Sequence, residues 1–190
     1  MFYRLAALLI AYCCSATLAY ADNTAPNEAF SAFSKFELSP ATMGEAYQGN
    51  EANDRSRTNL DHNLGLTLQP QLESWTNDKG SRTLVIQPHI KGIRFIGTAA
   101  RIWFGMMGGS SWIVVKVSFV DKDSGEQVGS ALFFRSAKGN GISGPRRDYK
   151  MIETMAADIT SYMQANYDKA VGGVGNGIYP PEKFLKVSKG

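Results

Sequence analysis

The stretch WIVVKVSFVDKDSGEQVGSALFF, residues 112–134, decides the fold of this chain. Every second residue along its first half is apolar. In a strand, these residues lie on one face: Ile113, Val115, Val117 and Phe119. The turn at residues 121–125 follows, and Gly125 can adopt the positive φ that a hairpin loop requires. Residues 127–134 then return as a second strand. The stretch therefore predicts an antiparallel β-hairpin.

Two amphipathic helices flank this hairpin along the chain. Upstream, apolar residues at spacings of four and three predict a helix whose buried face carries Leu60, Leu64, Leu68, Leu72 and Trp75. Pro70 removes an amide donor within this pattern, so we expect a kink or a break there. Downstream, residues 145–167 predict a second helix with a buried stripe of Ile152, Met155, Ile159 and Met163.

The remaining strands complete a two-layer arrangement. Residues 34–38 predict a short first strand that Pro40 ends, and residues 41–52 predict a loop. Residues 82–95 alternate like a strand, in which Pro88 predicts an edge position or a bulge. The order is β-α-β-β-β-α. We therefore predict an α+β fold, a two-layer sandwich of about four mainly antiparallel strands with both helices on one face.

The first 21 residues, MFYRLAALLIAYCCSATLAYA, have the pattern of a secretory signal peptide. Arg4 supplies the positive start, an apolar run follows, and small residues precede the expected cut before Asp22. We then expect a flexible leader at residues 22–33, one α+β domain at 34–169 and a flexible tail at 170–190. The mature protein would be periplasmic or secreted.

Two alternatives to cleavage stay open. An uncleaved anchor is disfavoured, because the apolar run is shorter than the roughly 18 to 20 residues that a spanning helix needs. Lipidation of Cys13 or Cys14 is disfavoured, because the bulky Tyr12 stands where a lipidation motif has a small residue. The mature chain contains no further segment that could span a membrane.

The composition of the mature chain excludes several function classes. Without Arg4 it has 19 basic and 17 acidic side chains, a balance too even to predict nucleic-acid binding. Both cysteines are lost with the leader, which excludes a thiol nucleophile and a thiolate metal site. His62 and His89 lack metal-ligand spacing, so we expect no metal and no cofactor.

Four motifs follow one another from Arg82 to Tyr167: TLVIQPHIKGIRFI, GTAARIWFGMMGGSS, WIVVKVSFVDKDSGEQV and the amphipathic helix that ends near Tyr167. With these motifs the chain resembles an uncharacterised family of bacterial envelope proteins, domain of unknown function 4410. The resemblance covers about half of the mature chain, and many members of the family are lipidated. It implies a periplasmic or membrane-associated domain and supplies no activity.

A glycine-rich loop before the second helix is one candidate binding site. Residues 139–144 satisfy G-x-G-x-x-G, but the βαβ unit and the following acidic residue of a dinucleotide site are missing. The start of a helix next to two arginines can still bind an anionic group. The candidate ligand-binding residues are Gly139, Gly141, Gly144, Arg146 and Arg147. The alternative is a flexible loop with two solvated arginines.

The connector between the second and third predicted strands is the other candidate site. Residues 102–115 contain no charged side chain. They could form a buried connector, or an exposed apolar loop that docks on a membrane or a partner. The candidate contact residues are Arg101, Trp103, Phe104, Met106 and Met107.

No residue set meets the geometric needs of a reaction. Residues 121–125 lack calcium-loop ligands, and no Ser, His and Asp arrangement is evident. We therefore predict a non-enzymatic periplasmic or secreted envelope protein that acts through contacts with a protein or a membrane. The alternative is a binding module for a small anionic ligand. The sequence leaves the partner, the pathway and the oligomeric state open.

Overall fold

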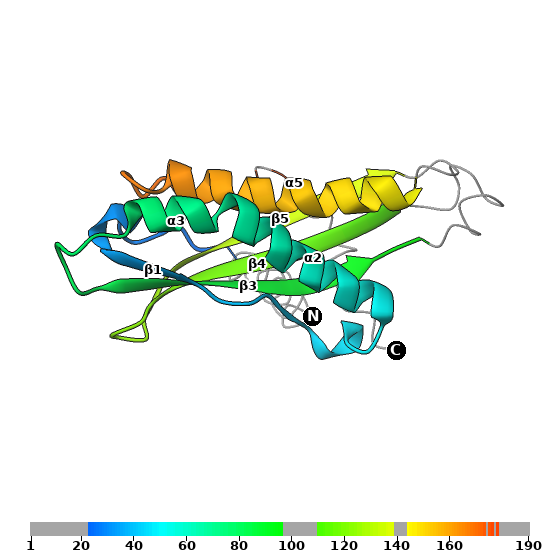
Figure 1. The fold of residues 1–190 in the computed structure, drawn as a ribbon, viewed down its shortest axis with the longest axis horizontal. Coiled ribbons are helices and arrows are strands. Elements are labelled where there is room, and N and C mark those ends of the chain that lie inside the picture. The colour runs from blue at the N-terminus through cyan, green and yellow to red at the C-terminus, as the bar shows by residue number, and fades with distance from the viewer. Residues whose placement is uncertain (1–22, 97–109, 139–143, 174, 177, 179–190) are drawn as a thin grey trace, which may run out of the picture.

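The computed structural model describes residues 23–96, 110–138, 144–173, 175–176 and 178. Two layers are visible in Figure 1, a twisted sheet and a layer of helices on one of its faces. The strands are β1 (Lys35–Leu38), β2 (Thr42–Met43), β3 (Thr83–Arg94), β4 (Ser110–Asp121) and β5 (Gln127–Lys138). The helices are the short 3-10 helices η1 (Phe30–Ala32) and η2 (Glu45–Tyr47), and the α-helices α2 (Glu51–Thr67), α3 (Gln69–Trp75) and α5 (Gly144–Ala165). The predicted α+β class and two-layer arrangement are confirmed.

The sheet is mixed and has one strand more than expected. Its order is β1-β3-β4-β5, and β2 pairs with β3 beyond the end of β1. Both β1 and β2 run parallel to β3, whereas β3, β4 and β5 are antiparallel neighbours. The predicted hairpin is confirmed, with Val115 opposite Phe133 and a positive φ of 72° at Gly125. The missed strand β2 has only two residues, too few for a visible alternation.

The edge position predicted for Pro88 is wrong, because β3 has neighbouring strands on both sides. The carbonyl oxygens of Ile86 and Ile90 face β1 and β2, where they accept hydrogen bonds from the amides of Ser39 and Gly44. Pro88 has the same orientation, so its missing amide faces the gap between β1 and β2. A ladder bond is therefore not lost. The bulge in β3 lies a few residues later, between Ile90 and Gly92.

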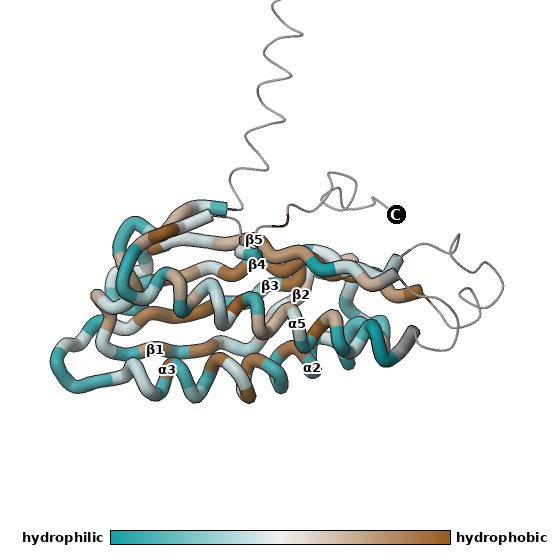
Figure 2. Tube along the Cα trace, turned by 90° about the horizontal axis from the view of Figure 1, so that it is seen from above, coloured by the Kyte–Doolittle hydropathy of each residue, from teal (hydrophilic) through white to brown (hydrophobic). Residues whose placement is uncertain are grey.

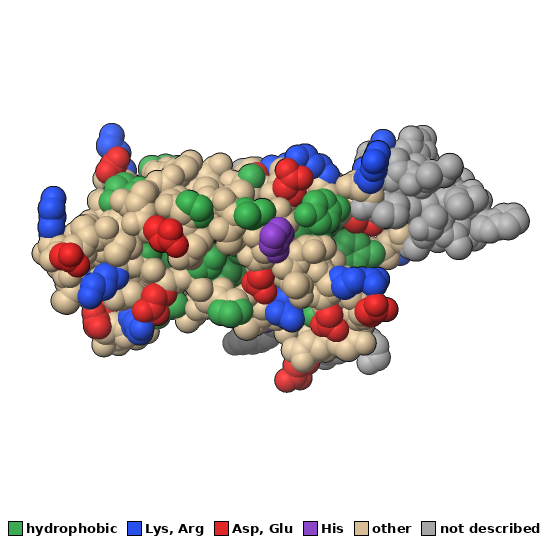
Figure 3. Space-filling model, viewed as in Figure 1, with side chains coloured by type: hydrophobic (Ala, Val, Ile, Leu, Met, Phe, Trp, Pro, Cys, Tyr) green, Lys and Arg blue, Asp and Glu red, His purple; other side chains and the backbone are tan. Residues whose placement is uncertain are grey.

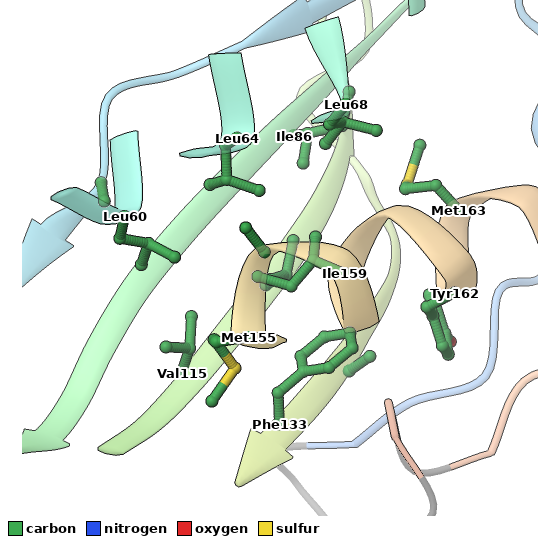
Figure 4. Packing of buried hydrophobic residues seen from close by; sticks show 14 of the residues in the cluster. Leu60, Leu64, Leu68, Ile86, Val115, Phe133, Met155, Ile159, Tyr162 and Met163 are labelled. Atoms are coloured by element: carbon green, nitrogen blue, oxygen red, sulfur yellow. The ribbon is translucent and has the colours of Figure 1, made fainter. Parts of the chain in front are cut away.

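Both helical segments cover the same face of the sheet. The predicted break at Pro70 is confirmed, since α2 ends at Thr67 and α3 starts at Gln69 with the proline in its first turn. The side chain of Asn50 accepts hydrogen bonds from the amides of Ala52 and Asn53, which caps the start of α2. Figure 4 shows the core between the layers, where these buried side chains meet: Leu60, Leu64, Leu68, Ile86, Val115, Phe133, Met155, Ile159 and Met163.

Hydrophobic residues follow the strands in Figure 2, and the polar ones gather in the turns and on the outer sides of the helices. The helical face of the molecule carries acidic and basic side chains among small apolar patches (Figure 3). On the opposite face, a separate group of buried residues forms what we call the open-face cluster: Trp112, Val114, Leu132 and Phe134.

Segments from both ends of the described chain pair with the outer edge of β5. Thr24 and Ser130 exchange two backbone hydrogen bonds of 2.8 Å. The amide of Gly175 donates to the carbonyl of Leu132 at 3.0 Å. Parts of the segments that we predict to be a flexible leader (22–33) and a flexible tail (170–190) thus satisfy polar groups that an edge strand would otherwise expose.

Candidate functional site

Two separate parts of the chain that the sequence marks as candidate sites leave the sheet at one end. β3 finishes at Arg94 and β5 at Lys138, while β4 starts at Ser110 and α5 at Gly144. In the ladders, Arg94 lies opposite Trp112, and Ser110 lies opposite Lys138. We call this the connector end, because these ends of β3, β4, β5 and α5 flank residues 97–109 and 139–143 in the sequence; the element ends are seen in Figure 1.

The start of α5 makes the connector end basic. Residues 135–150 include a single acidic residue, Asp148, and these five basic ones: Arg135, Lys138, Arg146, Arg147 and Lys150. The side chains of Arg146 and Arg147 are exposed. The first turn of α5 also has amides without helical acceptors, which favour negative charge nearby.

A hollow of about 360 Å³ lies where β5 meets α5, and we call it the β5 hollow. Its polar lining consists of Arg135, Ser136, Arg147, Lys150 and Thr154. Lys150 is exposed and pairs with Glu153 at 2.6 Å, a contact that water weakens. The ammonium of Lys150 therefore remains accessible to an incoming anion.

Arg135 is held in place on one side of this hollow. Its Nε and Nη2 atoms donate to the two carboxylate oxygens of Asp158, at 2.5 and 2.6 Å. This hydrogen bonding raises the pKa of Arg135. Asn176 also donates to Asp158, at 3.0 Å. The carboxylate of Asp158 on α5 therefore binds both Arg135 on β5 and Asn176 in the chain after α5. These contacts indicate a structural role for Asp158.

A second ionic group lies at the other end of the sandwich. Arg82 donates to Glu28 at 2.6 Å and to Asp121 at 2.8 Å, and its guanidinium lies 4.2 Å from the centre of the Phe33 ring. Hydrogen bonding to Arg82 holds the pKa of both carboxyl groups below its ordinary value. Sequence reasoning missed this group, because its members are 39 and 54 residues apart from Arg82.

The two histidines lie apart. His62 is exposed on α2, whereas His89 on β3 makes a 2.8 Å hydrogen bond between its Nδ1 and Oγ1 of Thr42. Within the described residues, no three His, Cys, Asp or Glu side chains are grouped so that they could hold a metal ion. Likewise, no helix in the described part of the chain has the length and apolarity to cross a membrane.

The structure describes only some of the candidate site residues. All five connector residues lie outside the described part of the chain: Arg101, Trp103, Phe104, Met106 and Met107. Gly139 and Gly141 lie outside it as well, while Gly144 is the first residue of α5. The structure adds one observation: the strand and helix ends that flank residues 97–109 and 139–143 lie at the same end of the sheet. This observation does not test the role of either segment.

Comparison with known proteins does not assign the chain to a family. No protein-family model matches it, and no curated protein does either. The PelC dodecamer from Paraburkholderia phytofirmans is 14% identical, with a TM-score of 0.42, over 73% of this chain and 94% of that one. A minor lipoprotein from Acinetobacter baumannii is 14% identical, with a TM-score of 0.37, over 71% of this chain and 95% of that one. A Xanthomonas campestris protein of the DUF330 family is 9% identical, with a TM-score of 0.40, over 75% of this chain and 88% of that one. Similarity at this level assigns neither an activity nor a partner.

Proposed function

We propose that this chain is an exported protein of the bacterial cell envelope that acts by contact with a membrane surface and not by catalysis. The contact is made by the connector end. The observation that supports this most directly is that the end of β3 and the start of β4, which the connector joins, lie at the same end of the sheet as the end of β5. The basic start of α5 follows β5 there. The family resemblance to domain of unknown function 4410 is part of the same proposal, as is the signal peptide at residues 1–21.

The chemistry of the connector end fits an anionic membrane surface. Trp103 and Phe104 are aromatic residues of the kind that anchor proteins in the headgroup region. Basic residues near an anionic membrane contribute roughly 1 kcal/mol each to binding. Arg146 and Arg147 are exposed. Arg147 lines the β5 hollow with Ala137, which lies opposite Ser111 near the start of β4. Apolar insertion and charge attraction would therefore act at one place.

A charge-reversal experiment tests this proposal. The chain without its leader is mixed with vesicles of phosphatidylglycerol and phosphatidylcholine, and the bound fraction is measured by co-sedimentation. We expect Arg146→Glu with Arg147→Glu to reduce binding by about tenfold or more, because each reversal removes an attraction and adds a repulsion. The matched control is Lys79→Glu with Lys169→Glu, which changes the charge equally at exposed positions away from the connector end.

Equal losses in both double variants would contradict a localised contact and indicate attraction to net charge alone. A separate variant, Trp103→Ser with Phe104→Ser, tests the apolar part. We expect it to fold with an unchanged circular dichroism spectrum and to bind vesicles more weakly. Loss of folding in this variant would instead show that the connector belongs to the core.

The second candidate function is binding of a small anionic ligand at residues 139–147. The β5 hollow favours it, because Arg147 and Lys150 border an open space large enough for a phosphate-sized group. Titration of inorganic phosphate in the absence of membranes separates the two candidates. Shifts of the amide signals of residues 144–147 would favour this candidate, and no shift at millimolar phosphate would exclude it.

A further inference from the structure

The open-face cluster is buried although it lies on the side of the sheet that α2, α3 and α5 leave uncovered. Val114 lies opposite Phe134, and Lys116 lies opposite Leu132, so these side chains share the face away from α2 and α5. Val114 is 0% exposed and Leu132 is 3% exposed. Farther along the same face, Lys116 and Ser118 of β4 are half-buried. Apolar residues this well buried need a covering layer at one end of the face.

The cluster is built into the sheet. Gly92 has no side chain, and a Cβ atom there would come within 2.8 Å of the Trp112 ring. Because Gly92 is a glycine, the indole can lie close against β3. The four side chains therefore form a dense apolar surface with a fixed shape, not a scatter of single residues.

The chain after α5 arrives beside this surface. The amide of Gly175 donates to the carbonyl of Leu132, and the Nδ2 atom of Asn176 donates to the carbonyl of Phe134 at 2.9 Å. A Cβ atom at Gly175 would lie 2.6 Å from Cζ of Phe133, whose ring belongs to the core on the helical side, so the backbone passes tightly along the edge of β5. From this edge the following residues can reach either face, and the backbone of two members of the open-face cluster, Leu132 and Phe134, holds the segment there.

The composition of the remaining chain suits such a cover. Residues 179–190, YPPEKFLKVSKG, contain Tyr179, Phe184, Leu185 and Val187. Two adjacent prolines favour an extended path and disfavour a helix. Twelve extended residues reach roughly 40 Å, and crossing from β5 to β4 needs only about 5 Å. The lysines of this segment can stay in water while its apolar residues face the sheet.

We propose that residues 179–190 dock on the open-face cluster and cover this end of the face opposite α2, α3 and α5. In this proposal, the C-terminal segment of the chain itself binds the apolar surface that β4 and β5 form. This inference does not depend on the proposed membrane contact, because it concerns other residues.

Thiol labelling tests the proposal cleanly. The chain has only two cysteines, Cys13 and Cys14, so a background with both changed to serine carries a single introduced thiol. Val114→Cys reports on the open-face cluster. Val117→Cys is the matched control, because Val117 is equally buried but faces the helices. Each is made in the full chain and in a chain that ends at residue 178, and the rate of reaction with a maleimide is measured.

We expect the thiol introduced by Val114→Cys to react at least about tenfold faster in the shortened chain, with the thiol of Val117→Cys unchanged. In the full chain, Phe184→Ser with Leu185→Ser should give the same increase, and Lys183→Ser with Lys186→Ser should not. An unchanged rate at position 114 would overturn the proposal, as would an equal increase at both positions. Protection that is lost on dilution would also overturn it, since a second copy would then be the cover.

Discussion

Tyr162 shows how one buried polar atom affects the core. Its ring stacks on Phe119 at 5.7 Å and meets Phe133 edge-on, and the residue is 5% exposed. In Figure 4 it projects from α5 beside the other core residues. The hydroxyl oxygen has no hydrogen-bond partner within the described residues. The aromatic ring therefore supplies the stabilisation, and the hydroxyl reduces it.

We predict that Tyr162→Phe leaves the free energy of unfolding unchanged or raises it by up to about 1 kcal/mol, because an unpaired buried hydroxyl is removed. Urea denaturation measures this. Burial raises the pKa of Tyr162 to about 12, so the folded state keeps its proton at a pH where the unfolded state has lost it. Stability should fall from about pH 10 toward pH 12, and less so in the variant. A clear loss of stability at pH 7 in Tyr162→Phe would contradict the assignment.

The group around Arg82 predicts a loss of stability in acid. The pKa values of Glu28 and Asp121 are lowered by hydrogen bonding to Arg82. Their stabilising contribution is therefore present above about pH 4 and is lost as the pH falls through the lowered values. We predict that Arg82→Gln reduces the free energy of unfolding at pH 7 and flattens its dependence between about pH 5 and pH 2.

The matched control for this acid titration is Lys122→Gln. Lys122 also bridges to a carboxylate, that of Glu37, but the side chains of this pair are 54% and 49% exposed. Exposed ion pairs contribute only about 0 to 1 kcal/mol. A variant of Lys122 that lost as much stability as the Arg82 variant would contradict the distinction between the two groups.

At the scale of elements, the 3.6-residue and two-residue periodicities were enough to predict α2, α3, α5, β3, β4 and β5. The strands with clear alternation are long, and each has one face buried against helices. The parallel pairing of β1 and β2 could not be predicted in the same way. It depends on which side of β3 the N-terminal segment reaches, and no local pattern contains that information.

Helix α2 offers a direct test of the predicted buried stripe. Leu64 is 0% exposed and faces the sheet, whereas Leu66, two residues later, is 63% exposed. We predict that Leu64→Ala lowers the free energy of unfolding by about 2–5 kcal/mol, because it leaves a cavity. Leu66→Ala should change it by less than about 0.5 kcal/mol. Denaturant titration of the two variants measures the difference. Similar losses in both would contradict the packing of α2.

At the scale of the whole molecule, the candidate site depends on topology. The two candidate segments, Arg101–Trp112 and Gly139–Arg147, are separated by β4 and β5 in the sequence. Neither motif by itself predicts that the strands next to both segments end on the same side of the sheet. The antiparallel register of β3, β4 and β5 brings Arg94, Ser110 and Lys138 to the same end of the sheet. The residue types of the site are therefore visible in the sequence, and the predicted hairpin already places the start of β4 beside the end of β5. The register that brings the end of β3 to the same place was not predicted.

The most direct measurement of the proposed function is the fluorescence of Trp103 in a variant carrying Trp75→Phe and Trp112→Phe, which leaves it as the sole tryptophan. Membrane contact through the connector end predicts a shift of its emission to shorter wavelength when phosphatidylglycerol vesicles are added, and no shift with phosphatidylcholine alone. Binding of the protein to the anionic vesicles without any change in the emission of Trp103 would contradict the proposal.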